Sequence, residues 1–286
     1  MIFDQIFIGI RIFLVAQLLH LASLDVSAQE PQIASLDFCA DHYVLTLAES
    51  DWIAGLSVDS RGVYALPNGE ARTLPQLPAK PEPLIMSDIN HVVRLWGGSQ
   101  KLVDQLSKQN IAVTQLGFST NFDHVWNNIA LLAEHLAIGP TKLTAIKQNH
   151  DDKRTRLAEQ RSRLDAISAL YITPGGVTAG RGTMIDTIIT QAGLKNKAAQ
   201  DGHSGWVPMS LEMVVMDPPD IIISGFFDSP LEQANHWSAA HHPVFADLFD
   251  RIPTISLPLH QIGCAGPASL DAALTLQKHL QSWSPS

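Results

Sequence analysis

Short apolar runs alternate with amphipathic segments along most of the chain, and this pattern predicts buried strands separated by helices. Apolar runs bounded by polar or turn-forming residues predict strands over 33–36, 52–57, 91–95, 111–116, 169–172, 221–223 and 254–257. Helical spacing predicts one helix through Tyr43, Val44, Leu47 and Ala48, and others over 99–109, 183–192 and 269–280. Strands that alternate with helices favour parallel sheets that are covered on both faces.

One long polar segment, residues 141–168, separates two copies of this pattern. It contains no Gly or Pro and holds seven of the 19 Lys and Arg residues. As a continuous helix it would extend about 40 Å, at about 1.5 Å per residue. Its thin apolar stripe is typical of a helix that bridges domains in solvent, with an ordinary surface helix as the alternative. We therefore expect an α/β fold with two Rossmann-like lobes, 29–140 and 169–286, whose parallel-type sheets are joined by one long bridging helix.

The first 28 residues have the pattern of an export signal. An apolar run over 12–24 is short for a membrane span, and Val-Ser-Ala before Gln29 supplies the small residues that a signal peptidase accepts. We expect a signal peptide over 1–28 and a mature protein in the periplasm. A buried N-terminal helix is the alternative, because the region ahead of the apolar run carries little net positive charge.

Composition and charge exclude several classes of protein. The 286 residues are 45% apolar, which is ample for a buried core, and near-average Gly and Pro contents argue against disorder. A net charge of −9 argues against binding to nucleic acid, which needs clustered cations. Two cysteines are too few for a disulfide-dense scaffold or for a zinc site built from cysteine alone.

The two cysteines, Cys39 and Cys264, both follow predicted strands. In an oxidising compartment two cysteines pair more often than they stay free. A disulfide between them would connect the two lobes and would require Cα atoms within about 7 Å. Two separate buried thiols, or thiols that contact a ligand, are the alternatives.

Each half of the chain contains a Glu-led segment at the same distance from a strand. Glu82 lies ten residues before Val92, and Glu212 lies ten residues before Ile222. A single Glu in the first turn of a short helix is favourable to the helix dipole and needs no further role. The duplication is therefore the informative feature.

Several segments, taken in order, resemble a known family. They are 33–42 (IASLDFCADH), the Glu82 segment, the long polar helix, 180–183 (GRGT), 192–194 (AGL), 210–220 and 264–267 (CAGP). Their order and spacing resemble periplasmic substrate-binding proteins of ABC importers, in the single-helix-hinged group that serves cobalamin, ferric siderophores and haem. The similarity covers roughly residues 31–280.

The resemblance implies a monomer that captures a metal chelate or corrinoid between two lobes and delivers it to ABC permease subunits in the inner membrane. It implies that Glu82 and Glu212 dock against permease arginines, where charge-assisted contacts orient two rigid bodies. A stiff single-helix hinge implies small lobe motion on binding. The protein would need no cofactor of its own, although its ligand can carry iron or cobalt. An enzyme or a non-transport sensor on the same fold is the alternative, although the sequence has no GxSxG elbow or P-loop.

Ligand contacts are expected from loops that follow the carboxyl ends of parallel strands. Aromatic side chains in these loops can stack on a flat macrocycle, and Arg181 can pair with an anionic group. No HxH or HExxH spacing predicts a resident metal site, although one histidine that ligates the ligand's metal is an alternative. The candidate ligand residues are Cys39, Asp41, His42, Trp96, Arg181, His203, Trp206, Phe226 and His260.

Overall fold

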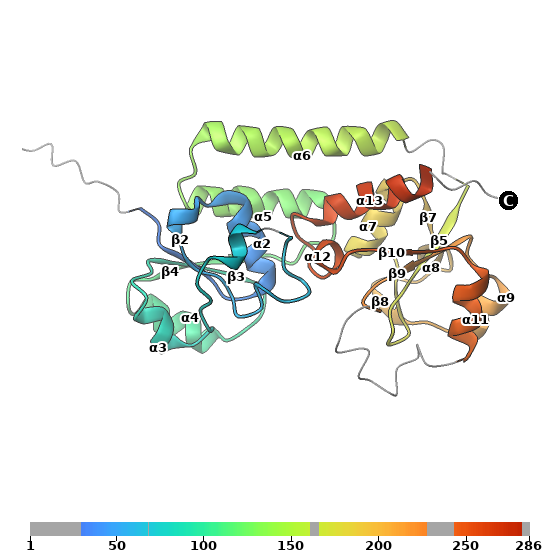
Figure 1. The fold of residues 1–286 in the computed structure, drawn as a ribbon, viewed down its shortest axis with the longest axis horizontal. Coiled ribbons are helices and arrows are strands. Elements are labelled where there is room, and N and C mark those ends of the chain that lie inside the picture. The colour runs from blue at the N-terminus through green and yellow to red at the C-terminus, as the bar shows by residue number, and fades with distance from the viewer. Residues whose placement is uncertain (1–29, 68, 161–165, 228–242, 282–286) are drawn as a thin grey trace, which may run out of the picture. The chain divides into compact units, whose positions relative to one another are not determined.

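Residues 30–67, 69–160, 166–227 and 243–281 are described by the structure, a computed structural model (Figure 1). From Pro31 onward they belong to one compact unit. The signal peptide predicted over 1–28 lies outside the described residues. None of the helices in the described part of the chain is both long and apolar enough to cross a membrane.

The N-terminal half forms a four-stranded sheet in the order β2-β1-β3-β4, and every strand pair is parallel. Its strands are β1 (Ile33–Ser35), β2 (Ile53–Gly55), β3 (His91–Leu95) and β4 (Ala112–Leu116). Its helices are α2 (Phe38–Leu47), α3 (Pro81–Ile85), α4 (Gln100–Ser107) and α5 (Phe122–His135), with short 3₁₀ turns at η1 (Ser50–Trp52) and η2 (Glu70–Arg72). Helices α2 and α5 pack together, as do α3 and α4.

Side-chain caps explain where three of these helices begin. Asp37, Ser99 and Asn121 each accept a hydrogen bond from a main-chain N–H in the first turn of α2, α4 and α5. The sequence analysis did not predict α5. A signal was present, because Asn121 precedes apolar residues at helical spacing.

The C-terminal half forms a second four-stranded parallel sheet in the order β10-β9-β5-β7. Its strands are β5 (Ser168–Ile172), β7 (Lys195–Asn196), β9 (Ile221–Ser224) and β10 (Thr254–Ser256). An antiparallel ribbon of β6 (Val177–Ala179) and β8 (Trp206–Pro208) accompanies it. Its helices are α7 (Met184–Gln191), α8 (Lys197–Gln200), α9 (Leu211–Met216), α11 (Pro243–Arg251), α12 (Leu259–Ile262) and α13 (Ser269–Gln281).

The two sheets share one topology. In the first, the chain leaves β1 for β2 on one side and later returns to β3 on the other. In the second, it leaves β5 for β7 and returns to β9. Each sheet therefore has a point where the strand order reverses, between β1 and β3 and between β5 and β9, and ligands of open parallel sheets bind outside the carboxyl ends of strands at such points.

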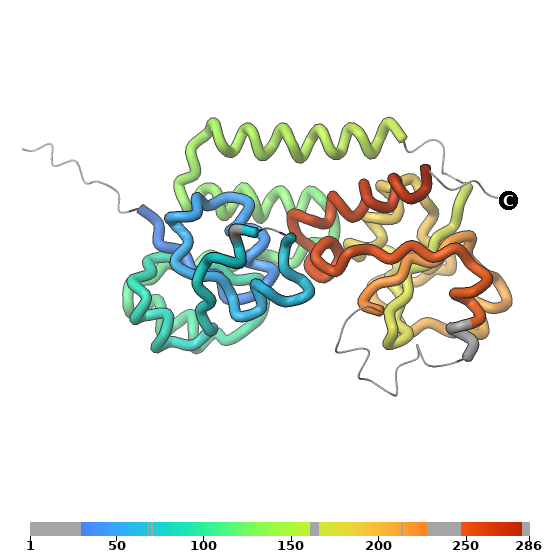
Figure 2. Tube along the Cα trace, in the orientation of Figure 1, coloured from blue at the N-terminus to red at the C-terminus, as the bar shows by residue number. Residues whose placement is uncertain are grey.

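The long helix α6 (Pro140–Gln160) connects the two halves. It was predicted over 141–168, but β5 already begins at Ser168, and 161–165 lie outside the described residues. Arg154 on α6 pairs with Asp123 on α5, and Lys153 pairs with Asp271 on α13. Figure 2 shows that the chain passes between the two halves through α6. Helix α13, in red, packs against α6 and α7. The predicted α/β fold, two parallel sheets with one long helix between them, is confirmed.

Candidate ligand-binding site

The loops that follow β1 and β3 form one side of a pocket of about 350 Å³ at the carboxyl edge of the N-terminal sheet. Asp37 holds the two loops together, because its carboxylate accepts from Ala40 N and from Leu95 N, both at 2.8 Å. The pocket lies where the strand order reverses. Apolar side chains, a glycine turn and one cation line it: Leu36, Phe38, Arg94, Trp96, Gly98 and Leu102.

An exposed aromatic pair stands at the same edge. Trp96, a predicted ligand residue, lies after β3, and Phe118 lies after β4. Their ring centroids are 5.3 Å apart in an edge-to-face arrangement, and about half of each side chain is exposed. Sequence reasoning missed Phe118, although an aromatic residue just past a predicted strand end was a usable signal.

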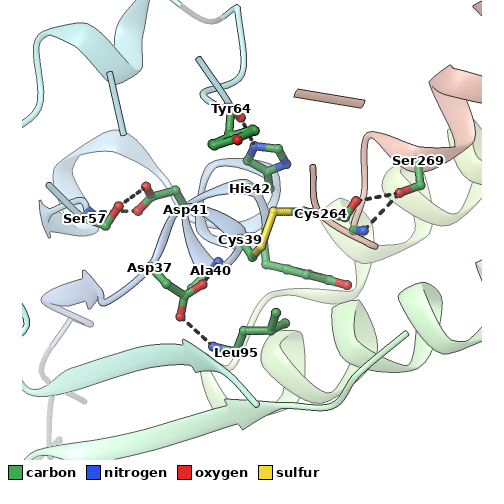
Figure 3. The surroundings of a disulfide bond; sticks show 12 residues. Asp37, Cys39, Ala40, Asp41, His42, Ser57, Tyr64, Leu95, Cys264 and Ser269 are labelled. Carbon is green, nitrogen blue, oxygen red and sulfur yellow. Dashed lines mark hydrogen bonds between the residues drawn. A yellow bond between two sulfur atoms is a disulfide. The ribbon is translucent and has the colours of Figure 1, made fainter. Parts of the chain in front are cut away.

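A disulfide joins the first half of the chain to the second (Figure 3). Cys39 on α2 and Cys264 after α12 have Cα atoms 5.5 Å apart, and 225 positions separate them in the sequence. Ser269 fixes the Cys264 loop by donating to Cys264 O at 2.9 Å and accepting from Gly266 N at 3.1 Å. Of the alternatives that the sequence left open, the structure has the pair, so Cys39 lines the pocket as half of a disulfide and not as a free thiol.

Asp41 and His42, both predicted ligand residues, have buried side chains that contact other parts of the protein. Asp41 accepts from Ser35 Oγ, from Ser57 N at 2.9 Å and from Ser57 Oγ at 2.6 Å. Burial raises the pKa of the Asp41 carboxyl above its usual value, and these hydrogen bonds oppose the rise. Asp41 therefore fastens α2 to β1 and to the residues after β2.

His42 points in a different direction from Asp41, toward the main chain of Tyr64 (Figure 3). Its Nε2 atom lies 3.0 Å from the main-chain oxygen of Tyr64, and Nδ1 has no partner among the described residues. Burial lowers the pKa of His42 to about 4, so the ring is neutral at pH 7. Nearby His260 is partly buried, and burial also lowers its pKa.

Three aromatic side chains form a cluster that includes Phe226, another predicted ligand residue, and Phe38, the neighbour of Cys39. Tyr64 stacks on Phe38 with centroids 4.9 Å apart and lies 6.0 Å from Phe226. Gly263 lies against the Tyr64 ring, where an added Cβ would come within 2.7 Å of Cδ1. We call Cys39, His42, Tyr64, Phe226 and Cys264 the junction. Its side chains pack N-terminal elements against C-terminal ones.

The edge of the C-terminal sheet carries a different arrangement. Trp206 on β8 is half exposed and lies edge-to-face on Tyr171, with centroids 6.0 Å apart. The Tyr171 hydroxyl is buried, has no partner in the described part of the chain, and lies against Gly225, where any side chain would collide with it. Burial raises the pKa of the Tyr171 phenol.

Two predicted ligand residues lie in other pockets. Arg181 is exposed, donates to Ala199 O at 3.2 Å and lines a pocket of about 500 Å³ beside α7 and β7. His203 lines a pocket of about 210 Å³ with Lys197 and Asp201. The structure therefore does not bring Arg181 or His203 into the pocket beside Trp96. In the described ranges, no three His, Cys, Asp or Glu side chains gather as metal ligands would.

The two Glu-led segments form matched surface features. Glu82 lies in the first turn of α3 and Glu212 in the first turn of α9, and both are exposed. Four residues beyond each lies a methionine, Met86 or Met216, that is 82% exposed. Each short helix therefore presents a carboxylate and an apolar side chain to solvent.

Comparisons with known proteins address the fold. Neither the protein-family models nor the curated proteins searched contain a match to the sequence. Among solved structures, the periplasmic haem-binding protein HutB of Vibrio cholerae matches with a TM-score of 0.70 at 18% identity, covering 88% of this chain and 99% of that one. The chain has the fold of a periplasmic binding protein. The resemblance expected from the sequence is therefore confirmed at the level of the fold.

Two further solved structures match the fold, one of an apo haem-binding protein and one of a vitamin B12 binding protein. The periplasmic haem-binding protein RhuT of Roseiflexus sp. RS-1, in its apo form, matches with a TM-score of 0.67 at 20% identity, covering 87% of this chain and 97% of that one. The periplasmic vitamin B12 binding protein BtuF of Vibrio cholerae matches with a TM-score of 0.62 at 17% identity, covering 87% and 96%. One fold therefore serves more than one kind of ligand.

Proposed function

We propose that this chain is the substrate-binding component of an ABC import system. It captures a metal chelate or corrinoid, namely a ferric siderophore, cobalamin or haem, between an N-terminal lobe (29–140) and a C-terminal lobe (169–286), and delivers it to the membrane permease as a monomer. The observation that carries the proposal is the fold match along nearly the full length of binding proteins for haem and vitamin B12. The matched proteins are binding proteins, which supports capture without turnover.

The pocket edge supports a ligand of this class. Trp96 and Phe118 offer aromatic surface for a flat ring, and Trp206 offers the same at the edge of the second sheet. The Cys39–Cys264 disulfide connects α2 to the Cys264 loop, so large separation of the two lobes would require breaking it. Binding is therefore expected to change lobe positions only slightly.

Residues Glu82 and Glu212 are proposed to dock the two lobes on the permease. Each carboxylate is exposed at the start of a short helix, so it can meet a cation without moving the fold. Met86 and Met216 add apolar surface at equivalent positions. Two such features with the same spacing suit a partner built from two similar subunits.

Docking is tested by reversing both charges, E82K with E212K, beside a control that reverses two other exposed glutamates, E134K with E159K. The docking pair is expected to abolish stimulation of the permease–ATPase complex in proteoliposomes, while ligand affinity stays unchanged. The control pair is expected to retain stimulation. Stimulation that survives E82K with E212K contradicts the docking assignment.

Export to the periplasm is part of the proposal. A disulfide between Cys39 and Cys264 forms and persists in an oxidising compartment, and 1–28 have the pattern of a signal peptide. Intact-mass analysis of the protein from a periplasmic extract is expected to give a mature chain that begins at Gln29 with both cysteines oxidised. A full-length cytoplasmic chain with free thiols would contradict it.

Ligand capture is tested by calorimetry of the mature protein with haem, cobalamin and a ferric siderophore, each in turn. One of the three is expected to bind at a one-to-one ratio with a Kd below about 1 µM, which corresponds to about −8 kcal/mol. The same titrations are monitored for chemical change of the ligand. Failure of all three to bind, or turnover of any, contradicts the proposed function.

A further inference from the structure

The pocket at the edge of the N-terminal sheet contains a buried cation that has no counter-charge among the residues that the structure describes. Arg94, the fourth residue of β3, is only 5% exposed. Its guanidinium donates to two main-chain oxygens, Leu95 O at 3.5 Å and Ser99 O at 3.3 Å. No carboxylate oxygen of the described residues comes within 4.0 Å of its nitrogens.

The other strongly buried cation in the described part of the chain is neutralised. Lys197 is 9% exposed, and its Nζ atom lies 2.7 Å from a carboxylate oxygen of both Asp201 and Asp217. A charge removed from water is costly unless an opposite charge or strong hydrogen bonds replace the water. Lys197 has that compensation from two carboxylates, whereas none of the described residues supplies an anion to Arg94, so a bound ligand can supply it.

The surrounding loops hold the guanidinium at the pocket. Gly98 has φ +77°, a backbone conformation that favours glycine, and its Cα hydrogens lie against the Arg94 guanidinium, where an added Cβ would come within 2.7 Å of Nη2 and displace it. Asp37 also lines the pocket, but its two carboxylate oxygens already accept from Ala40 N and Leu95 N. Arg94 is therefore the group in this pocket that is suited to bind an anion.

The apolar wall limits what kind of molecule carries that anion. Phe38, Leu36, Leu102 and Trp96 line the pocket with Arg94, and Phe118 extends the aromatic surface beside Trp96. A freely hydrated inorganic ion would leave this surface in contact with water. An extended apolar ring with a charged group at its edge would cover it.

We propose that Arg94 forms an anion subsite that binds a carboxylate or phosphate at the periphery of a macrocyclic ligand, through charge-assisted hydrogen bonds from its guanidinium. The subsite rests on the proposed function and adds a requirement to it, because the ligand must carry an oxyanion at its edge. A porphyrin carboxylate and the phosphate of a corrinoid share this chemistry.

The test uses two pairs of probes that differ in the anion. Haem is compared with its dimethyl ester, which has no free carboxylate, and cobalamin is compared with cobinamide, which lacks the nucleotide and its phosphate. Each is titrated into the mature protein in the same dilute detergent, and binding is followed by ligand absorbance. In the pair that binds, loss of the anion is expected to weaken binding about ten-fold or more.

Three variants locate the effect. R94Q is expected to bind the charged and uncharged members of that pair equally, and R94K, which keeps the charge but not the planar fork, is expected to be intermediate. K101Q, which removes an exposed charge from α4, is the matched control and is expected to behave as wild type. Circular dichroism of each variant establishes that the fold is intact.

The outcomes separate this subsite from the proposed function. Equal affinity of wild type for charged and uncharged probes, or a preference that survives in R94Q, overturns the subsite and leaves the import function standing. Binding of none of the four macrocycles also overturns it, and stimulation of the permease–ATPase complex then decides about import independently. A wild-type preference that R94Q abolishes supports the subsite, and the pair that shows it identifies the anion.

Discussion

The junction and the pocket that contains Arg94 share Cys39 at the start of α2, yet their buried polar side chains differ in the partners that they have. In the junction, the cysteines are joined to each other, and the His42 ring contacts a main-chain oxygen. In the pocket, Arg94 is buried, and no carboxylate from the described part of the chain pairs with it. The difference teaches that burial alone does not distinguish a structural group from a binding group. What distinguishes them is charge: the His42 ring is neutral, although its Nδ1 atom has no partner among the described residues, whereas Arg94 carries a charge that no described carboxylate compensates.

The largest expected effect of a substitution on stability comes from the disulfide of the junction. Replacing both cysteines, C39S with C264S, removes a crosslink across 225 positions, and chain entropy assigns such a loop about 5 kcal/mol of unfolding free energy. Urea denaturation of the double variant beside oxidised wild type measures the loss. A loss below about 1 kcal/mol would show that packing alone holds the junction together.

Acid should also lower the free energy of unfolding, through His42 of the junction and through His91 on β3. The pKa of His42 falls from 6.5 to about 4 on folding, so the unfolded state binds more protons between these values. His91 has the same shift, because it too is buried. The contribution of each neutral histidine to the free energy of unfolding is therefore fully present above about pH 6.5. It is lost as the pH falls toward 4, by about 3 kcal/mol for each histidine. The raised pKa of Asp41 acts in the opposite sense, because its neutral form is favoured as the pH falls.

The pH effect is measured by urea denaturation at a series of pH values from 7 to 4. H42Q is expected to remove about half of the histidine-dependent fall in unfolding free energy with pH. The control H124Q, at an exposed position, is expected to leave that pH dependence unchanged. An H42Q variant whose slope equals that of wild type would contradict the buried, neutral state of His42.

A smaller loss is expected at Asp41. D41A leaves the hydroxyls of Ser35 and Ser57 and one main-chain N–H without their acceptor, and such a change costs about 1–3 kcal/mol. Thermal unfolding beside D59A, an exposed control, measures it. Loss of ligand affinity in D41A with unchanged stability would contradict this structural role and support the ligand role that the sequence predicts for Asp41.

The smallest effect on stability is expected at Arg94. It tests directly whether this buried cation has a structural role. R94Q removes a charge that no carboxylate of the described chain compensates, so the unfolding free energy should change by less than about 1 kcal/mol or should rise. K197Q removes a cation that two carboxylates compensate. Because water can reach the Asp201 and Asp217 carboxylates that are left behind, the variant should be destabilised by only about 1 kcal/mol. If R94Q is the less stable of the two, Arg94 has a structural role.

The apolar pattern predicted most of the elements, because strands buried on both faces have few polar residues. It could not separate Cys39, Asp41 and His42 from one another, because α2 is buried on nearly every side and shows no polar stripe. Only contacts with Ser57, Tyr64 and Cys264, distant in the sequence, assign each residue its role. Arg94 left a signal that was missed, since a charged residue inside a run predicted to be buried on both faces needs a partner.

The most direct measurement of the central claim is native mass spectrometry of the ligand that the protein retains when it is purified from periplasmic extract. The account predicts one macrocycle or chelate per chain, with the mass and isotope pattern of an iron or cobalt compound, released on unfolding. A retained sugar, amino acid or nucleotide, or a chain that stays empty and also fails to bind haem, cobalamin and a ferric siderophore, would contradict it.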